Sequence, residues 1–386
     1  MQGNNLCPLG LDVSAIVDSI NKNDTQAAAD NILKNHPLPS ICGRVCKAPC
    51  KGDGNVNTQI LQKFVEVRGE YRQIPVDGSA KKVAIVGAGP AGLAAAQRLL
   101  QLGLKPTIFE AANVGGGMLA DVIPSFALPR EMLAEDIKTL TKMGVEIKTG
   151  SMVGKDIDWN TLEKDFDAVL VATGAGKGVL PSIQGAGLKG NVSVIDFMKE
   201  VESGKAEITG NVVVQGGGLA AIQAARVAKK QGAASVTVVH PFPLDKWPAG
   251  PEEIEAAKKD GVELLPDNRV TDLWGLYGSI DTVVTRPVEY TIEDSRGRVS
   301  GIDMGKQNRI PATLFIAAVN RKPSDNSGLG KYEKCQRGTL KIDDGYRLST
   351  KGWYAAGEAA TGAAGIVDSM VTGQLAAEAI KKDLEV

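Results

Sequence analysis

Apolar and glycine-rich stretches alternate regularly from Lys82 onward. The run KVAIV is followed by GAGPAG and then by LAAAQRLLQLGL, a strand-length apolar segment, a glycine turn and a helix-length segment rich in alanine and leucine. A second apolar stretch, PTIF, runs into Glu110. The same order returns about 130 residues later in NVVVQGGGLAAIQAARVAKKQGAASVTVVH. This pattern predicts two strand–turn–helix–strand units, each built on a parallel sheet.

Two further strand-length segments and a closing helix lie between and after these units. DFDAVLVATGAGKG (165–178) and TLFIAAVNRKP (313–323) are apolar runs that end in glycine or polar turns. The C-terminal stretch GWYAAGEAATGAAGIVDSMVTGQLAAEAIKKDL predicts a short strand, a glycine-rich turn and a long amphipathic helix. We therefore expect the first nucleotide-binding fold to be completed at the C-terminus, with the second fold nested inside it.

The first 78 residues follow a helical pattern instead. LDVSAIVDSINKND and DTQAAADNILKNHP place apolar residues three and four apart, and Asp24 or Thr25 is suited to cap the second helix. NTQILQKFVEVRGEY predicts a third helix, and IPVDGSAKK is the linker. The predicted domains are a helical domain at 1–78, a first nucleotide domain split into 79–203 and 330–386, and a second nucleotide domain at 204–329. The fold class is α/β, with two nested Rossmann-like dinucleotide-binding domains preceded by the small α-helical domain.

Composition narrows the function classes. Lys and Arg total 44 and Asp and Glu total 45, which argues against a nucleic-acid partner or a polybasic membrane anchor. The apolar runs are too short to span a bilayer, and the N-terminus MQGNNLCPLG lacks the features of a secretory signal. A cytoplasmic protein is expected. In that reducing compartment the four cysteines among the first 50 residues are more typical of metal ligands than of disulfides, whereas Cys335 stands alone and is expected to be structural.

The first glycine turn predicts a dinucleotide site. Gly87 permits the tight turn, Gly89 lets a pyrophosphate approach the backbone, and Gly92 lets helix and strand pack closely. The helix N-terminus then faces the phosphates, where its free N–H groups favour negative charge. Glu110, at the end of the next strand, is placed to accept hydrogen bonds from ribose hydroxyls.

Further motifs carry a family resemblance. Two such units, an ATG strand end and the final AAGEAATG turn together resemble flavoproteins with two dinucleotide-binding domains, in which the first fold holds FAD. With HPLPSICGRVCKAPC, GGGMLADVIPSFALPREML and VLVATGAGKG added, nearly the whole chain resembles the small-subunit family of NADPH-dependent glutamate synthase. Relatives of that family include the N-terminal part of dihydropyrimidine dehydrogenase and the large subunit of electron-bifurcating transhydrogenase. The helical domain is then expected to be an iron–sulfur domain.

The resemblance implies a set of FAD contacts besides the glycines of the first turn. In that superfamily an acidic residue in the terminal turn bonds the ribityl–phosphate region of the flavin, and Glu358 stands at this place instead of the usual Asp. The residues expected to hold FAD are Gly87, Gly89, Pro90, Ala91, Gly92, Glu110, Gly117, Met118, Ala172, Thr173, Gly174, Gly357, Glu358, Gly365, Ile366 and Val367.

The resemblance also assigns the N-terminal cysteines. It implies one inner [4Fe-4S] cluster beside the flavin, held by Cys7, Cys46, Cys50 and a fourth ligand. Gln62 stands where several relatives place a Glu or Gln ligand, and Cys42 is the alternative, because four thiolates are the commonest set. Asp53 occupies the place of an outer-cluster cysteine, so no outer cluster is expected. A zinc site built from all four cysteines is the competing interpretation.

The second nucleotide turn departs from the family pattern. Gly216, Gly218, Leu219 and Ala220 still predict a pyrophosphate site at a helix start. Where the family carries a Tyr-Arg-Arg-like run that grips the NADPH 2′-phosphate, this chain has His240-Pro-Phe, with Lys246 as a weak substitute, and Asn320 replaces a glycine of the family. NAD(H) is therefore favoured over NADP(H), and a non-functional nicotinamide site is the alternative.

These motifs predict an electron-transfer subunit of a multi-subunit oxidoreductase. FAD exchanges hydride with NAD(H) and single electrons with the cluster, so no side chain is expected to act as a catalytic acid, base or nucleophile. The expected partner is a larger catalytic subunit, a ferredoxin-like iron–sulfur subunit, or both. The alternatives are an electron relay without a working nicotinamide site, an NADPH-dependent glutamate synthase small subunit, and a structural subunit without cofactors.

Overall fold

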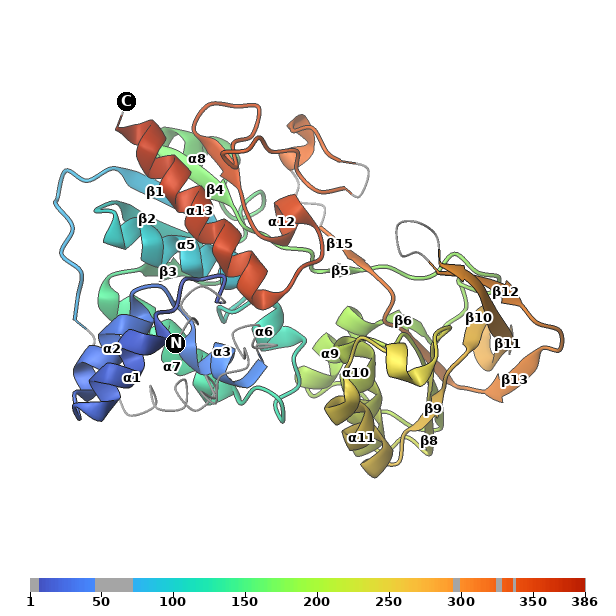
Figure 1. The fold of residues 1–386 in the computed structure, drawn as a ribbon. Coiled ribbons are helices and arrows are strands. Elements are labelled where there is room, and N and C mark those ends of the chain that lie inside the picture. Colours follow the sequence, from blue (N-terminus) through green and yellow to red (C-terminus); the bar gives the residue numbers. More distant parts are fainter. Residues whose placement is uncertain (1–6, 46–71, 294–298, 324–327, 336–337, 386) are drawn as a thin grey trace. The chain divides into compact units, whose positions relative to one another are not determined.

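The protein divides into two compact units (Figure 1). The computed structural model describes residues 7–45, 72–293, 299–323, 328–335 and 338–385. The first unit comprises Met1–Ala120, Ser125–Gly176 and Lys322–Val386, and the second comprises Asp121–Pro124 and Lys177–Arg321. Among the helices of the described ranges, none is both long and apolar enough to cross a membrane.

A five-stranded parallel sheet forms the centre of the first unit. Its strand order is β3-β2-β1-β4-β16, so the chain runs outward from β1 to one side and then continues on the other. The strands are β1 (Lys82–Val86), β2 (Lys105–Phe109), β3 (Glu146–Lys148), β4 (Ala168–Val171) and β16 (Trp353–Ala355). The order reverses between β1 and β4, which is the place where parallel α/β sheets bind ligands beyond the carboxyl ends of their strands.

Helices cover both faces of this sheet. Ala84 and Val86 of β1 pack with Trp159 and Leu162 of α8, whereas Ile85 faces α5. The long helix α13 packs along α5, as Figure 1 shows. The helical elements are α5 (Pro90–Gln101), α6 (Met118–Asp121), α7 (Arg130–Met143), α8 (Trp159–Asp165), η2 (Leu329–Lys331), α12 (Glu358–Thr361) and α13 (Ile366–Leu384).

A hydrogen-bonded ion pair fastens the end of α13 to the edge of the sheet. Arg347 donates from Nε and Nη2 to the two carboxylate oxygens of Asp383 at 2.6 and 2.7 Å, and the hydroxyl of Tyr354 donates to Asp383 at 2.7 Å. Hydrogen bonds to charged groups contribute about 1.5–3 kcal/mol each when they are removed singly. Both side chains of the pair are partly exposed to solvent. The net contribution of the pair to the free energy of unfolding therefore lies at the low end of this range.

Replacing Asp383 with alanine is expected to destabilise the protein by about 2 kcal/mol, because Arg347 and the Tyr354 hydroxyl lose their acceptor. Urea unfolding followed by circular dichroism measures this loss. Glu385→Ala is the control, since it breaks only the exposed pair with Lys381 on the same helix and is expected to cost less than about 0.5 kcal/mol. Equal losses in the two variants would contradict the assignment.

The second unit repeats the parallel sheet and adds an antiparallel one. The strand order of the parallel sheet is β6-β14-β7-β8-β9, and the antiparallel sheet consists of β10, β11, β12 and β13. The two sheets share a hydrophobic core, to which the antiparallel sheet contributes Val270, Leu273 and Val283 and the parallel sheet contributes Val213 and Phe315. The elements are β5 (Lys177–Gly178), β6 (Asn191–Ser193), α9 (Val194–Glu202), β7 (Asn211–Gln215), α10 (Leu219–Lys230), β8 (Ser235–Val239), η1 (Leu244–Lys246), α11 (Pro251–Lys259), β9 (Glu263–Leu265), β10 (Asn268–Leu276), β11 (Ser279–Glu293), β12 (Val299–Asp303), β13 (Asn308–Pro311), β14 (Leu314–Ala317) and β15 (Arg321–Lys322).

The units divide the chain at other residues than the sequence pattern suggested. The expected second domain ran from 204 to 329, whereas the compact unit consists of Lys177–Arg321 together with the short segment Asp121–Pro124. The reason is that β6, which precedes the second glycine turn, pairs in parallel with β14. A three-residue strand of this kind carries no period of its own, so only its pairing assigns it to a sheet.

Three helices of the N-terminal domain lie in the described residues. They are α1 (Val13–Asn21), α2 (Thr25–Leu33) and α3 (Pro39–Val45). Asp12 and Asp24 cap the first two, each accepting a hydrogen bond from the backbone N–H of the third residue after it, so Asp24 rather than Thr25 is the cap of α2. The predicted third helix of the sequence pattern, residues 57–71, lies outside the described residues.

Candidate functional site

The first glycine turn has the close backbone contacts that its motif predicts. Gly87 takes a φ of +109°, and a Cβ there would lie 2.5 Å from the carbonyl oxygen of Ala172, the residue that follows β4. A Cβ on Gly92 would overlap the carbonyl oxygen of Gly87. Only glycine fits these two places, and the turn is thereby held at the point where the strand order reverses.

The start of α5 is open to an anion. Gly89 is the N-cap in extended conformation, no side chain caps the helix, and Pro90 occupies the first turn. Within the described residues, no atom beyond the chain neighbours lies within 4 Å of the place that a Cβ on Gly89 would take. The N–H groups at Ala91 and Gly92 therefore belong to a helix N-terminus that no described side chain caps, which is the arrangement that binds a pyrophosphate.

Glu110, at the end of β2, binds the backbone of the first glycine turn through its carboxylate. Its Oε2 accepts the Ala88 N–H at 2.7 Å, and its Oε1 accepts the Ala112 N–H at 2.8 Å. Each carboxylate oxygen has two lone pairs, so both can accept a second hydrogen bond. The acidic residue is thus placed against the turn as expected, and its contact with a ribose stays a prediction.

Two other predicted segments border the same turn. Gly117, with a φ of +55°, places its Cβ position 3.4 Å from the Cα of Gly89, and Met118 begins α6 directly after it. Thr173 lies beside Gly87, where a Cβ would be 3.3 Å from the Thr173 Cα. Gly174 follows with a φ of +69°, and in the described part of the chain no atom beyond its neighbours lies within 4 Å of its Cβ position. The structure therefore brings these residues to the turn.

The C-terminal closure reaches the start of α5 as well. Gly357 takes a φ of +62°, and a Cβ there would lie 2.7 Å from the Cβ of Ala91. Gly365 is the N-cap of α13, ahead of Ile366 and Val367, and its N–H donates to Asp368 at 3.0 Å. Glu358 is 5% exposed, and its Oε1 accepts the Ala364 N–H at 2.9 Å. This bond orders the closing loop, and a flavin contact by Glu358 stays a prediction.

Gly373, which no sequence motif singled out, decides how closely α13 approaches the turn. A Cβ at this position would overlap the backbone carbonyl of Ala91. Thr372, the residue before it, accepts the N–H of Gly357 on its hydroxyl at 2.9 Å. Both contacts join the helix to the first turn of α5 and to the closing loop. A glycine inside a predicted amphipathic helix was the signal that could have indicated such a packing site.

The first unit therefore fits an FAD-type dinucleotide. The fit rests on a cradle in which glycines admit close approach, on a helix start without a protein cap, and on a carboxylate beside the turn. Each of these features is complementary to a pyrophosphate flanked by ribose.

The second turn has the same backbone design. Gly216 takes a φ of +138°, with its Cβ position 2.6 Å from the carbonyl oxygen of Ala318, the residue after β14. Gly218 is the N-cap of α10, without a side-chain cap, and Leu219 and Ala220 are the first helical residues. A pyrophosphate therefore has an open helix start in this unit too.

His240 covers the middle of this second turn with a neutral ring. A Cβ on Gly217 would lie 2.6–2.9 Å from atoms of the His240 ring. Phe242 and Trp247 lie beside the ring, with centroids 5.2 and 5.3 Å away, and Ala249 donates its N–H to the Gly217 carbonyl. Burial lowers the pKa of His240 to about 4, so the imidazole is uncharged at neutral pH.

The other two residues that depart from the family pattern, Lys246 and Asn320, also belong to the second unit. Lys246, the only lysine or arginine of segment 240–250, is 70% exposed and pairs with Asp245 at 3.9 Å. Asn320 is exposed and accepts the N–H of Arg321 on its side-chain oxygen at 2.8 Å. The described strand end after β8 therefore presents aromatic rings where a 2′-phosphate would need cations.

Three glutamines fasten the helical domain to the first nucleotide fold. Gln97 and Gln101 of α5 donate to the carbonyls of Leu33 and Lys34 at 2.8 and 3.0 Å, and Gln374 of α13 donates to the carbonyl of Asn35 at 2.8 Å. The last carbonyls of a helix have no partner within it. Three consecutive carbonyls at the end of α2 are thus bound by side chains from α5 and α13, an arrangement we call the glutamine clamp.

Asp136 holds the next helix of the same domain. Its carboxylate lies on α7 and accepts the N–H groups of Ser40 and Ile41 at 3.4 and 3.3 Å, at the start of α3. The side chain is 4% exposed, and burial raises the pKa of Asp136 to about 7 even though these N–H groups oppose the shift. The clamp and Asp136 together bind the α2–α3 connection from both ends.

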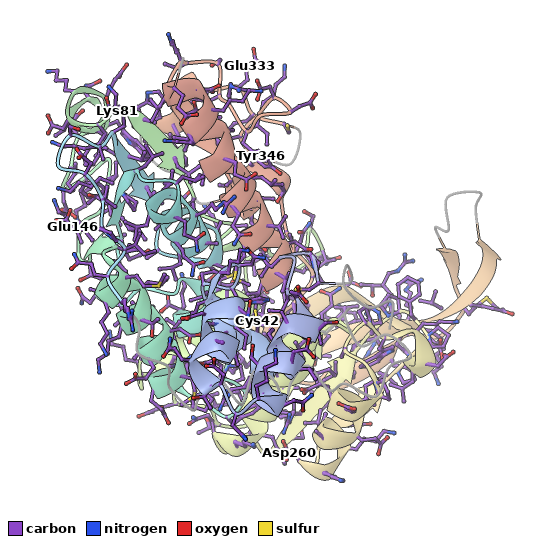
Figure 2. The ribbon with its side chains drawn as sticks, turned by 60° about the vertical axis from the view of Figure 1, so that its left-hand side comes forward. Cys42, Lys81, Glu146, Asp260, Glu333 and Tyr346 are labelled. Atoms are coloured by element: carbon purple, nitrogen blue, oxygen red, sulfur yellow. The ribbon has the colours of Figure 1, made fainter. Side chains whose placement is uncertain are left out.

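The structure describes part of the expected cluster site. Cys7 is half-buried, packs against the α1–α2 core and lies 3.6 Å from Nε2 of His36. Cys42, labelled in Figure 2, is 1% exposed and lies in α3. Cys46, Cys50 and Gln62 lie outside the described residues, so the ligand set, including the choice between Gln62 and Cys42, stays a prediction. Cys335, expected to be structural, is exposed.

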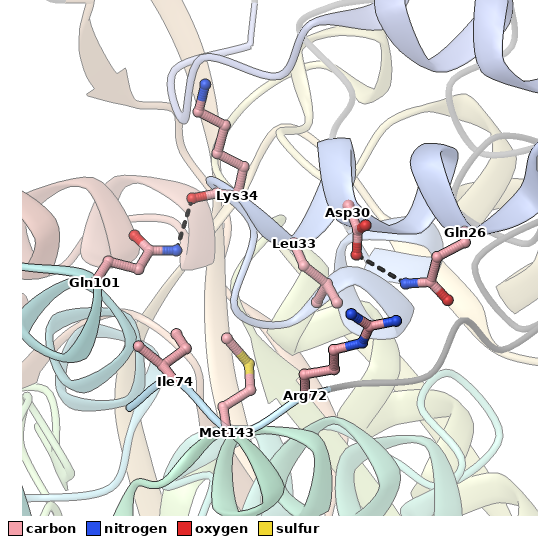
Figure 3. A pocket seen from close by; sticks show the side chains of 8 residues that line it. All are labelled: Gln26, Asp30, Leu33, Lys34, Arg72, Ile74, Gln101 and Met143. Carbon is pink, nitrogen blue, oxygen red and sulfur yellow. Dashed lines mark hydrogen bonds between the residues drawn. The ribbon is translucent and has the colours of Figure 1, made fainter. Parts of the chain in front are cut away.

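A cavity of about 320 Å³ lies beside the glutamine clamp (Figure 3). Its lining includes Lys34, Arg72 and Gln101, and the Gln101 amide is drawn donating to the Lys34 carbonyl. Gln101 is the last residue of α5, whereas the glycine turn lies at the first. The cavity is therefore at the other end of α5 and is not the dinucleotide site.

Comparison with known proteins decides the family. Residues 81–382 match the model of the pyridine nucleotide-disulphide oxidoreductases. The chain belongs to this family. Residues 1–72 of this oxidoreductase match dihydropyrimidine dehydrogenase domain II, a 4Fe-4S cluster domain. The predicted type, an FAD- and NAD(P)-dependent oxidoreductase like the glutamate synthase small subunit with an N-terminal 4Fe-4S domain, is confirmed.

Curated relatives are subunits of larger enzymes. This oxidoreductase is 31% identical to the NADP(+)-dependent formate dehydrogenase subunit beta of Moorella thermoacetica, over 98% of the chain and 59% of that protein, so it spans little more than half of that relative. It is 28% identical to the Escherichia coli glutamate synthase [NADPH] small chain, over 93% of the chain and 83% of that protein. It is 29% identical to the E. coli NAD-dependent dihydropyrimidine dehydrogenase subunit PreT, over 98% and 90%.

The two-unit fold also occurs among solved structures. Mycobacterium tuberculosis FprA in complex with NADPH superposes with a TM-score of 0.69 and 18% identity, over 79% of this chain and 85% of that one. At this identity the likeness concerns the fold. It confirms the predicted α/β class with two Rossmann-like sheets.

Proposed function

We propose that this oxidoreductase is the FAD- and [4Fe-4S]-containing electron-transfer subunit of a multi-subunit enzyme, using NAD(H) at its second nucleotide fold. When bound, FAD exchanges hydride with a nicotinamide and single electrons with an iron–sulfur cluster, chemistry that side chains alone do not supply. The chain's own residues bind and orient the nucleotide cofactors. The open starts of α5 and α10 receive the two pyrophosphates, and Glu110 receives a ribose.

The glutamine clamp is the observation that carries this proposal. The two helices that donate its amides, α5 and α13, are the same helices whose N-terminal residues Gly89 and Gly365 belong to the predicted FAD site. The helical domain is thus held on the framework that shapes the flavin site. A fixed distance between two redox centres is what electron transfer requires, and rigid helices maintain it better than a free linker would.

Cofactor content and reduction test the proposal directly. The purified chain, reconstituted anaerobically with iron and sulfide, is expected to contain one FAD and about four irons with matching acid-labile sulfide. Adding NADH is expected to bleach the flavin absorbance and then to generate the spectrum of a reduced cluster. Zinc without labile sulfide would refute the cluster assignment, and a protein without flavin absorbance would support a purely structural subunit.

Nucleotide choice gives a separate prediction. Because a neutral His240 and two aromatic rings occupy the end of β8, NADH is expected to reduce the flavin at least about tenfold faster than NADPH at equal low concentrations. His240→Arg adds a cation and is expected to raise the NADPH rate about tenfold, the effect of one charge-assisted hydrogen bond. Stopped-flow reduction measures both rates. Wild-type preference for NADPH would contradict the assignment.

A relay without a nicotinamide reaction is the second candidate, favoured by one observation. The His240 ring covers Gly217 in the middle of the second turn, where a nucleotide would approach the backbone. In this case dithionite reduces the flavin, but neither NADH nor NADPH does. His240→Ala uncovers the turn and would then be expected to let a nicotinamide nucleotide reduce the flavin, because the obstructing ring is gone.

The electron acceptor is proposed by class. The relatives described above are subunits of larger enzymes, and this chain's near-zero net charge gives no reason to expect a nucleic acid. We expect a larger catalytic subunit or a ferredoxin-like iron–sulfur subunit to receive the electrons. Affinity purification from the native host under anaerobic conditions, followed by mass spectrometry, identifies it.

A further inference from the structure

We infer that His36 is a positioning residue for the cluster: its Nε2–H group donates a hydrogen bond to the sulfur of Cys7 and raises the reduction potential of the cluster. The inference rests on the proposed function, since it assumes that Cys7 is a cluster ligand. It adds a residue to that site which the cysteine pattern does not indicate.

The geometry is specific for a hydrogen bond. His36 Nε2 lies 3.6 Å from Cys7 Sγ, within hydrogen-bond distance of sulfur. Four protein ligands bind the four irons of a [4Fe-4S] cluster, one on each, so two ligands stand farther apart than this. A histidine in contact with a ligand sulfur is therefore a donor to that sulfur and not the fourth ligand.

The direction of the hydrogen bond follows from the surroundings of the ring. His36 is 2% exposed, and its Nδ1 is buried without a hydrogen-bond partner among the described residues. A neutral imidazole carries one proton, and a buried N–H without an acceptor is costly, so the proton lies on Nε2, beside sulfur. A metal-bound thiolate carries no proton of its own, so the hydrogen in this contact comes from the histidine.

The ring is held in place by the same clamp that fastens the domain. The His36 N–H donates to the Ile32 carbonyl at 3.0 Å, and the preceding residue, Asn35, is bound through its carbonyl by Gln374 of α13. A fixed N–H dipole aimed at a ligand sulfur stabilises the additional negative charge of a reduced cluster more than it stabilises the oxidised one. Hydrogen bonds to the sulfurs are a recognised determinant of cluster potential.

Two substitutions separate the hydrogen bond from the shape of the side chain. His36→Leu removes the donor, whereas His36→Gln places an amide N–H near the position of Nε2. In EPR-monitored redox titrations of the full chain, His36→Leu is expected to lower the equilibrium constant for cluster reduction about tenfold, which is about 59 mV for one electron. His36→Gln is expected to stay within about threefold of wild type.

Nitrogen labelling of the wild-type protein gives a second readout that needs no variant to fold. The chain has only two histidines, so ¹⁵N-histidine reports on His36 and His240 alone. Pulsed EPR of the reduced cluster is expected to show a histidine nitrogen coupling in wild type and in His240→Asn, and no such coupling in His36→Leu.

The outcomes distinguish this inference from the proposed function. A wild-type chain without iron and labile sulfide overturns the proposed function. A chain with a complete cluster but no histidine coupling overturns the inference alone. Equal potentials in wild type and in His36→Leu, or equal shifts in His36→Leu and His36→Gln, overturn it as well.

Discussion

Replacing Gly373 with alanine is expected to destabilise the first unit by about 3 kcal/mol and to weaken FAD binding at least tenfold. The added methyl group would overlap the backbone carbonyl of Ala91, and neither helix can yield at a backbone atom without moving. Because Ala91 lies in the first turn of α5, that movement displaces the N–H groups predicted to bind the pyrophosphate. FAD content after purification and urea unfolding measure the two effects.

The direction of the stability change in Gly373→Ala makes this experiment decisive. Glycine to alanine inside a helix normally stabilises a protein by about 0.5–1 kcal/mol, so the predicted loss opposes the intrinsic preference. Gly330 supplies the matched control within the same unit, since no atom of the described residues, chain neighbours aside, lies within 4 Å of its Cβ position. Gly330→Ala is expected to change stability by less than about 0.5 kcal/mol and to retain FAD. A Gly373→Ala protein that is as stable as wild type and retains its full FAD content would refute the proposed packing.

Raising the pH is expected to destabilise the protein through the buried carboxyl group of Asp136. Burial raises the pKa of this carboxyl from its ordinary 3.8 to about 7, so the folded protein holds the proton more tightly than the unfolded chain does. The corresponding stability is complete below about pH 4 and is lost as the pH rises through about 7. The loss amounts to up to about 4 kcal/mol.

Asp136→Asn tests this dependence because an amide mimics the neutral carboxyl without a titration. The variant is expected to gain stability relative to wild type as the pH rises from 5 to 8, by about 2–3 kcal/mol in urea unfolding. Asp18, an exposed residue of α1, is the control, and Asp18→Asn is expected to change stability by less than about 0.5 kcal/mol at each pH. A pH-independent difference between Asp136→Asn and wild type would show that the carboxylate is already ionised at pH 5.

The short-range sequence pattern was sufficient to predict the two nucleotide-binding turns. Strand–glycine–helix spacing is a local property, and the contacts of Gly87, Gly92 and Gly216 are those the motif requires. The loss of the cationic run after the second strand was also evident in the chain, where Pro and Phe follow His240, whereas the lowered pKa of His240 comes from its burial in the fold. The turns and the missing cationic run each extend over a few residues, so periodicity and side-chain chemistry determine them.

Other features depended on residues that are distant along the chain. The glutamine clamp joins Gln97 and Gln374 to Leu33 and Asn35, Gly373 meets Ala91, and Asp136 meets Ile41. A glutamine within a predicted helix has no local signature of such a contact, and a glycine there indicates a close approach without identifying the residue that approaches. β6 likewise joined the second unit only through its pairing with β14.

The sequence alone determined the fold class, the family and the two turns, because glycine conformation and apolar period act over a few residues. The tertiary structure decided how the helical domain is fastened to the nucleotide fold and that His36 lies against Cys7. The physical reason is that unpaired backbone carbonyls at a helix end, and a buried imidazole nitrogen, must find partners wherever the fold brings polar groups within reach.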